Sequence, residues 1–228
     1  MPHRAPSRAL VRLVILVVAA ALGAGACMGS LGSPTPVPGS SDVKSESRSV
    51  AMFSSVTVSG PLNVVLSTGA AEALIVEAPA NVLSLVTTEV DGSELVVKVE
   101  APGFTSANPA TVRITSPSID AVALEGGAHG TMEAMGQSLT VSASGGSVLK
   151  GIGAVQQLSL TVLGNSETEL GDLTSQTAAI ALAGGAKATI HVAKQLTGTA
   201  DGGSVVTLAS APTAQSVTLT GGAKIVGP

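Results

Sequence analysis

Pairs of small turn residues recur through the second half of this 228-residue chain at nearly constant spacing. Successive pairs begin 19, 19, 20, 18 and 19 residues apart. The six pairs are Gly126-Gly127, Gly145-Gly146, Gly164-Asn165, Gly184-Gly185, Gly202-Gly203 and Gly221-Gly222. A period sustained through six copies indicates one supersecondary unit stacked repeatedly, because no single unit can bury its own apolar face.

Apolar or small residues occupy every second position on both sides of each pair. Around Gly184, for example, these positions hold Ile180, Leu182, Ala186 and Ile190. The intervening positions are mostly Ser, Thr and Ala. A period of two is that of a β-strand, whose side chains alternate between faces. The pattern therefore predicts an all-β solenoid with coils of about 19 residues, an apolar interior and a hydroxyl-rich exterior.

The turn pairs predict a left-handed backbone at the corner of each coil. The second member is Gly in five pairs and Asn165 in the sixth. Asn is the residue other than Gly that most readily tolerates positive φ, so we expect positive φ at this second position. The pairs are accordingly interpreted as structural turns rather than as flexible loop filler.

The same register occurs once earlier in the chain, around Gly60. The 66 residues from Gly60 to Gly126 suit three longer coils with looser turns. Strand-like runs lie at residues 73–76, 82–90, 94–99 and 111–115.

The N-terminus predicts export and a lipid anchor. Residues 1–26 combine three arginines, a ten-residue apolar run too short for a comfortable transmembrane helix, and the small residues Ala24-Gly25-Ala26. Cys27, the single cysteine, follows directly, as in a bacterial lipobox, so we expect it to be lipidated. Ala24-Gly25-Ala26 also satisfies ordinary signal peptidase, which is the alternative. Residues 27–51 are rich in Gly, Ser and Pro and predict an extended tether before the 52–228 domain.

Composition excludes several classes of function. Removal of the leader leaves eight Lys or Arg against 15 Asp or Glu, a net charge of −7. Aromatic residues make up 1% of the chain. Nucleic-acid binding needs basic patches and stacking platforms, so neither DNA nor RNA is an expected partner. A single cysteine allows no disulfide within the chain.

Two segments carry a family resemblance. Residues 53–64, Phe-Ser-Ser-Val-Thr-Val-Ser-Gly-Pro-Leu-Asn-Val, and residues 90–97, Val-Asp-Gly-Ser-Glu-Leu-Val-Val, resemble the head GIN domain family of auto-transporter adhesins. Repeated Gly-Gly-Ala or Gly-Gly-Ser turns extend the resemblance over residues 52–228, although the family repeat usually reads Gly-Ser-Gly. The resemblance implies a right-handed, single-stranded parallel β-helix on an exported bacterial protein, and it brings no catalytic residues.

No constellation of residues predicts catalysis, a metal or a cofactor. Glu167 and Glu169 share one outward face, where the neighbouring coils place Lys150 and Lys187 beside them. This arrangement predicts a solvated ion-pair ladder rather than an acid–base pair. His129 and His191 fall in different outward columns several coils apart, so they do not predict a shared metal site. We therefore expect a protein that is not an enzyme.

Two classes of function remain open. The first is a lipid-anchored binding module, an adhesin whose Ser/Thr-rich face contacts a glycan or a protein. The second is a structural or regulatory envelope lipoprotein that docks onto a membrane-protein partner. The absence of Trp and Tyr argues against a sugar site of the stacking type. Both hypotheses place the protein outside the cytoplasm, held to the cell membrane or outer membrane by its lipid.

The C-terminal end of the stack presents an open strand edge. Residues 221–228 contain a short final strand with Lys224 and Pro228, which are devices that blunt such edges. We expect an end that either stays monomeric through these devices or binds a partner by strand addition.

Overall fold

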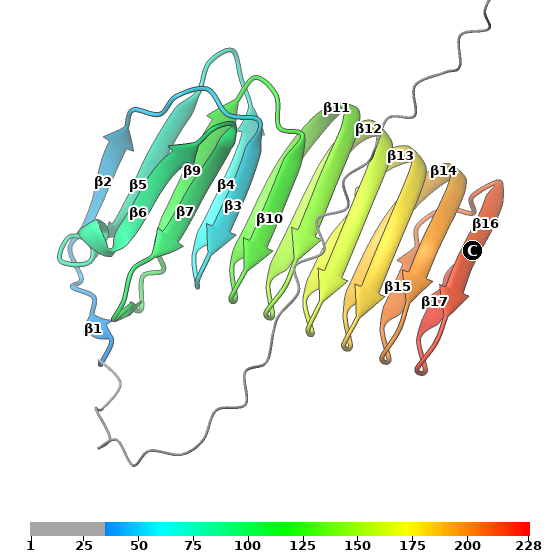
Figure 1. Cartoon of the computed structure of the whole chain (residues 1–228). Helices are drawn as coiled ribbons and strands as arrows, with labels where there is room; N and C mark the ends of the chain where they lie inside the picture. The colour runs from blue at the N-terminus through cyan, green and yellow to red at the C-terminus, as the bar shows by residue number, and fades with distance from the viewer. Residues whose placement is uncertain (1–34) are drawn as a thin grey trace, which may run out of the picture. The chain divides into compact units, whose positions relative to one another are not determined.

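A computed structural model describes residues 35–228, which form a β-solenoid of stacked coils (Figure 1). The solenoid has about six turns of about 19 residues each, and residues 35–228 contain no α-helix. All-β architecture and coil length agree with the sequence prediction.

Each regular coil is one long strand that bends midway into two arms. The four long strands are β11 (His129–Ala143), β12 (Val148–Leu163), β13 (Glu167–Ala183) and β14 (Lys187–Ala200). The start of β11 pairs with β4 (Asn63–Thr68), whereas its end pairs with β10 (Ala121–Glu125). The two arms of a coil therefore belong to two opposed parallel ladders, which we call the first-arm face and the second-arm face.

Both faces continue to the C-terminal end through shorter strands. On the first-arm face, β15 (Val205–Leu208) pairs with β14 and then with β17 (Lys224–Val226). On the second-arm face, β16 (Ala214–Leu219) pairs with the end of β14. Leu219 and Val226 in this last coil are exposed. Neither β16 nor β17 has a further strand beside it among residues 35–228.

The paired turn residues stack at one side of the coils. Both members of each pair have positive φ, for example 71° at Gly184 and 75° at Gly185, and Asn165 has φ of 61°. Two successive residues at positive φ reverse the chain tightly, as in the primed turns of hairpins. Gly60 extends this column toward the N-terminus, where its N–H donates to the carbonyl of Glu125 at 3.0 Å.

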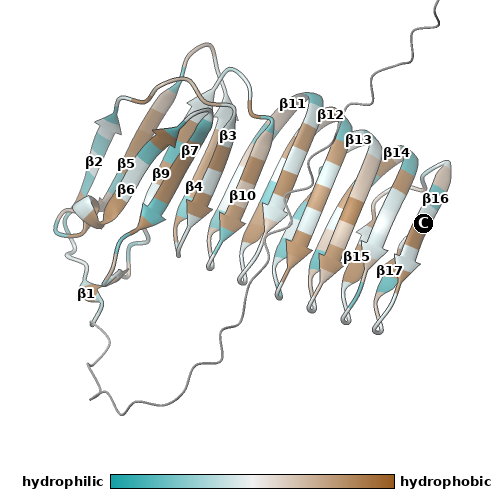
Figure 2. Cartoon of the chain, viewed as in Figure 1, coloured by the Kyte–Doolittle hydropathy of each residue, from teal (hydrophilic) through white to brown (hydrophobic). Residues whose placement is uncertain are grey.

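The core consists of aligned aliphatic side chains. Leu149, Leu170 and Ile190 are fully buried, and hydrophobic residues alternate with hydrophilic ones along the strands (Figure 2). Burial of one such side chain contributes roughly 1.5–3 kcal/mol. A side chain at Gly130 would collide with Leu149 and Leu124, so a thin core needs small residues as well as large ones.

The region between Gly60 and Gly126 departs from the three longer coils that the sequence suggests. Two antiparallel strand pairs occupy it instead. Strands β6 (Val86–Asp91) and β7 (Glu94–Val99) pair in antiparallel fashion, and β5 (Ala73–Pro79) is antiparallel to β9 (Thr111–Ser116). The predicted strand at 82–90 begins as a short 3₁₀-helix, η1 (Leu83–Leu85). The three-coil prediction is wrong because Gly92, at φ of 62°, sits in a two-residue hairpin loop that turns the chain back.

The order of coils in space differs from their order in the sequence. Strand β3 (Ser55–Ser59) lies between β7 and β10, and β4 lies between β9 and β11. Strand β7 lies outside β3 and β9 lies outside β4, so the first coil in the sequence is an inner layer of the stack, and residues that follow it fold back to cover its outer side.

Part of the predicted tether is ordered in the structure. Strand β2 (Val43–Arg48) pairs in antiparallel fashion with β5, and β1 (Val37–Pro38) pairs with β8 (Phe104–Thr105). The sequence predicts an extended tether over these residues, but residues 43–48 form a strand of the sheet. They do so because the edge of β5 has backbone N–H and C=O groups that need hydrogen-bond partners, and β2 supplies them.

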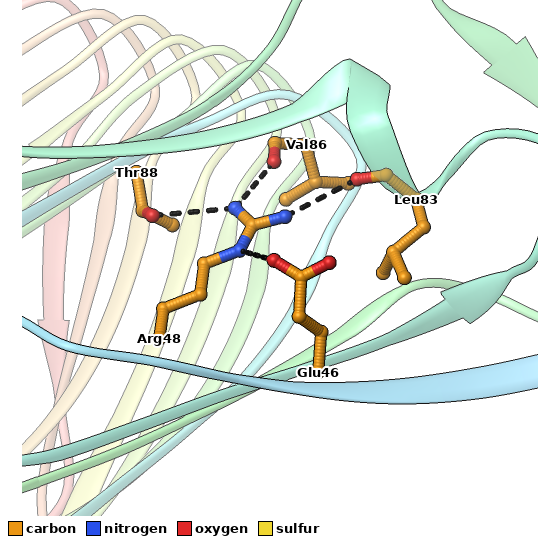
Figure 3. A network of polar contacts seen from close by, with 5 residues as sticks. All are labelled: Glu46, Arg48, Leu83, Val86 and Thr88. Atoms are coloured by element: carbon orange, nitrogen blue, oxygen red, sulfur yellow. Dashed lines mark hydrogen bonds and ion pairs between the residues drawn. The ribbon is translucent and has the colours of Figure 1, made fainter.

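The outermost elements β2, β5, η1 and β6 form the cap of the stack. Arg48 of β2 connects its own side of this cap to η1 and β6 on the opposite face (Figure 3). Its guanidinium donates to the carbonyl of Val86 at 2.6 Å, the carbonyl of Leu83 at 3.3 Å and the hydroxyl of Thr88 at 3.2 Å. Its Nε donates to the carboxylate of Glu46 at 2.7 Å. The side chain is only 16% exposed, so these bonds also satisfy a largely buried charge. The two faces are thus joined across the N-terminal end of the stack.

Candidate functional site

The second-arm face between β11 and β16 presents a regular array of small polar side chains. Because strand residues alternate, the arms direct Leu, Val and Ile inward and Ser, Thr, Gln and Ala outward. We call these outward residues the hydroxyl face: Ser138, Thr140, Ser142, Gln157, Ser159, Thr161, Thr177, Ala179, Ala181, Gln195, Thr197, Thr199, Ala214, Ser216 and Thr218. None of them carries a charge, which the hydroxyl-rich pattern of the sequence anticipates.

A groove of about 480 Å³ is hollowed into this face. Its walls are two columns of outward residues, namely Ser138, Gln157, Thr177 and Gln195 on one side and Thr140, Ser159, Ala179 and Thr197 on the other. Neighbouring strands are about 4.8 Å apart, so each column repeats a side chain at that interval along the solenoid axis. The short Ala179 side chain leaves the middle of the second column open.

The polar groups of the groove remain available to a ligand. Thr177 and Thr197 donate only long hydrogen bonds, of 3.5 and 3.4 Å, to the carbonyls of Gln156 and Ala178. No side-chain hydrogen bond within residues 35–228 involves the amides of Gln157 or Gln195. Each amide offers an acceptor oxygen and two donor hydrogens, and each hydroxyl offers both roles. The groove can therefore donate and accept hydrogen bonds along its whole length.

The first-arm face has the opposite character. Lys150 and Glu169 form an ion pair with 2.8 Å between Nζ and Oε2, and Glu167 aligns with Lys187. The sequence predicts this alignment of charges, although Lys150–Glu169 is the one ion pair that these four side chains form. The hydrogen bond and charge of Glu169 raise the pKa of Lys150 above its ordinary value. Both side chains are exposed, so solvent weakens the interaction.

The two histidines do not meet. His129 lies on the first-arm face beside Val148, whereas His191 aligns with Thr174 near the bend of its coil. Within residues 35–228, no three side chains of the types that bind metals gather in one place. The groove lining contains no titratable side chain.

The remaining predicted site residues lie away from the groove. The turn pairs form one side of every coil, where the hydroxyl of Ser166 accepts from the N–H groups of Gly146 and Ser147 at 3.1 and 3.2 Å. Cys27 and the predicted signal peptide fall outside the described residues. Residues 35–228 include no helix of the length and hydropathy needed to span a membrane.

Sequence reasoning missed the amide column, although the sequence carries a signal for it. Ser138, Gln157, Thr177 and Gln195 each precede the first glycine of the following turn by seven residues. Counting further outward from the turns would have aligned these side chains. The repeat alone does not specify the shape of the groove, because single positions such as Ala179 depart from the polar pattern of their column.

The stack of short parallel coils defines a β-solenoid, and one of its faces is polar and uncharged. The chain belongs to the family whose model is described as "Putative auto-transporter adhesin, head GIN domain", which matches residues 52–212. Membership implies a cell-surface or extracytoplasmic protein. The resemblance seen in the sequence is thereby confirmed.

Solved structures share this fold. A "putative adhesin" from Bacteroides fragilis has a TM-score of 0.68 at 14% identity and covers 84% of this chain and 100% of its own. A "putative adhesin" from Parabacteroides merdae has a TM-score of 0.51 at 13% identity and covers 84% and 98%. A "putative lipid binding protein" from Parabacteroides distasonis has a TM-score of 0.51 at 13% identity and covers 85% and 100%. At these identities the likeness shows the fold alone. No curated protein matches the sequence.

Proposed function

We propose that this protein is an exported, lipid-anchored binding module, an adhesin that contacts its ligand through the hydroxyl face. The observation that carries the proposal is the groove in that face, with its uncharged and largely unpaired hydrogen-bonding side chains. A ligand that fits in the groove exchanges its hydrogen bonds to water for hydrogen bonds to side chains whose positions the strands fix.

Rigidity of the array supports a binding role. The side chains project from parallel strands whose backbone hydrogen bonds fix their spacing, so little ordering is needed when a ligand binds. The first-arm face already pairs several of its charges internally. A neutral partner can therefore approach the hydroxyl face without breaking ion pairs.

The chemistry of the groove supports a role without catalysis. General acid–base catalysis needs a titratable group within hydrogen-bond reach of the reacting atoms. The groove offers only hydroxyls, amides and aliphatic groups. These groups bind and orient a partner but do not move protons at neutral pH.

Adhesion by this face can be tested with beads that are coated with the full chain. Substitution of Thr197 and Thr199 by Lys places two charges on the face while keeping the fold, because Thr197 and Thr199 project outward. We expect these beads to lose attachment to cells. Beads with Thr189 and Thr207 changed to Lys on the first-arm face provide the control, and equal loss from both would refute the assignment of the face.

Lipid anchoring at Cys27 has its own test. The motive is a lone cysteine directly after the small residues at 24–26. Changing Cys27 to Ser should move the protein from the membrane fraction to the soluble fraction of cells that export it. Unaltered partitioning would show that the anchor hypothesis is wrong, without bearing on the binding face.

A docking role at the envelope is the second candidate, and one observation favours it. On β11 and β12, Met135 and Ile152 are 71% and 53% exposed, and a hollow of about 310 Å³ lies beside Ile152 and Val65. Exposed apolar side chains in one area are typical of protein contacts. If Ile152→Ser rather than the Lys substitutions abolishes attachment, this candidate replaces the first.

A further inference from the structure

We infer that the ligand of the groove is a neutral, β-linked polysaccharide that lies along the solenoid axis. This inference rests on the proposed function, since it names the chemistry of the partner at the same face. Three features of the groove support it: its charge, its period and the size of its side chains.

Charge excludes most other polymers. Every lining residue is uncharged, so an ionic ligand would lose water without gaining a partner of opposite sign. The chain without its leader carries a net charge of −7, which further disfavours acidic glycans and nucleic acids. A neutral polymer rich in hydroxyl groups has no such cost, and it can both donate to and accept from Ser, Thr and Gln.

The period of the amide column fits a polymer whose units alternate. Gln157 and Gln195 are two coils apart, with the hydroxyl of Thr177 between them. Two coils advance about 9.6 Å along the axis, since adjacent strands are about 4.8 Å apart. In an extended β-1,4-linked glycan, such as a cello-oligosaccharide, each sugar is turned over relative to its neighbour, so every second sugar presents the same edge. One disaccharide thus spans two coils, with equivalent edges at the two amides.

Side-chain size sets how the polymer would bind. Ala179 is exposed between Ser159 and Thr197, which leaves room for a sugar ring at the centre of the groove. The groove has no aromatic residue for stacking, so each sugar contributes only a few hydrogen bonds. Such bonds contribute little individually, and affinity then depends on how many act together. We expect binding to grow with polymer length and to be weak for disaccharides.

The experiment uses the full chain with cello-oligosaccharides of increasing length, which are neutral and β-linked, and with hyaluronan as the acidic comparison. The Gln157→Ala/Gln195→Ala double variant should lose affinity for the long oligosaccharides by about tenfold or more. Ala179→Glu, which fills and charges the groove, should abolish binding. The matched controls are Gln156→Ala and Ala154→Glu, which alter exposed positions of β12 outside the hydroxyl face and should bind normally.

The outcomes separate the inference from the proposed function. Length-dependent binding of cello-oligosaccharides that both groove variants weaken, with hyaluronan unbound, supports the inference. Attachment of coated beads to cells without any cello-oligosaccharide binding overturns the ligand class but leaves the adhesin function standing. If the unaltered protein neither attaches to cells nor binds oligosaccharides, both the ligand class and the adhesin function are overturned. Binding that the controls reduce as much as the groove variants overturns the site.

Discussion

Residues 121–228 and residues 35–116 build one solenoid by different means. In residues 121–228, each inner coil pairs in parallel with a coil of nearly the same sequence pattern on either side. In residues 35–116, antiparallel strands and a short 3₁₀-helix complete the stack, and the first coil of the sequence lies inside strands that follow it. An interior coil has two like neighbours, so its sequence can repeat. An end coil has one neighbour, so the other side requires something that differs from the repeat.

This difference explains why the charged network of Arg48 lies in the cap rather than in the coils. Antiparallel β2 satisfies the edge of β5, but it does not by itself join the two faces. The guanidinium of Arg48 does so through carbonyls of η1 and β6. In the regular coils the bend and the turn of each strand make that connection through the backbone. The cap therefore depends on one side chain where the repeat depends on many equivalent residues.

The largest effect is expected from a change within the repeat. A side chain at Gly198 would fall on the carbonyl oxygen of Ile180 in the neighbouring coil, and Gly198 has φ of 135°. Gly198→Ala should therefore lower the free energy of unfolding by about 3–5 kcal/mol through overpacking and backbone strain together. Denaturant unfolding measures this loss. Gly203→Ala, with φ of 76° and no neighbouring atom within 4 Å, should cost only about 1–2 kcal/mol. Similar losses would show that coil contact does not limit position 198.

The cap should respond less strongly to loss of its central side chain. Arg48→Ala leaves the carbonyls of Leu83 and Val86 without their donor, and we expect about 2–4 kcal/mol of destabilisation. Hydrogen exchange should increase in β2 and β6 and remain unchanged in β12 and β13. Lys44→Ala, at an exposed position of the same strand, is the control. Faster exchange throughout the solenoid would contradict a cap that opens independently.

The turns provide a graded test of the repeat. Gly185 has φ of 75° and stacks on Asn165, whose own φ is 61°. Gly185→Val should cost on the order of 1–3 kcal/mol because a β-branched residue is strained at positive φ. Gly185→Asn should be milder, since Asn already occupies the equivalent corner one coil earlier. Thermal unfolding of the two variants compares them, and equal losses would argue against a left-handed requirement.

The sequence predicts the repeated half well for a physical reason that these turns illustrate. Each glycine pair and each alternating residue reports the same local geometry six times, so chance patterns are averaged out. The hairpin at Gly92 and the pairing of β2 with β5 occur once, and each depends on a contact between distant residues. The groove lies between these extremes: its two columns recur seven and five positions before each turn, but its hollow also depends on single side chains such as the short Ala179.

The smallest effect is expected on the charged face of the repeat. Glu169 raises the pKa of Lys150 above its ordinary 10.5, so the contribution of the pair is present below that pH and is lost as pH rises through the raised pKa. Both groups are solvated, and salt screens them. Lys150→Met should therefore leave the melting temperature nearly unchanged at neutral pH, with any difference shrinking in high salt and at strongly alkaline pH. Lys187→Met, which removes an aligned lysine without an ion pair, is the control. A large loss at neutral pH for Lys150→Met alone would mean that the ladder supports the coils, and the two regions would then both depend on individual charged side chains.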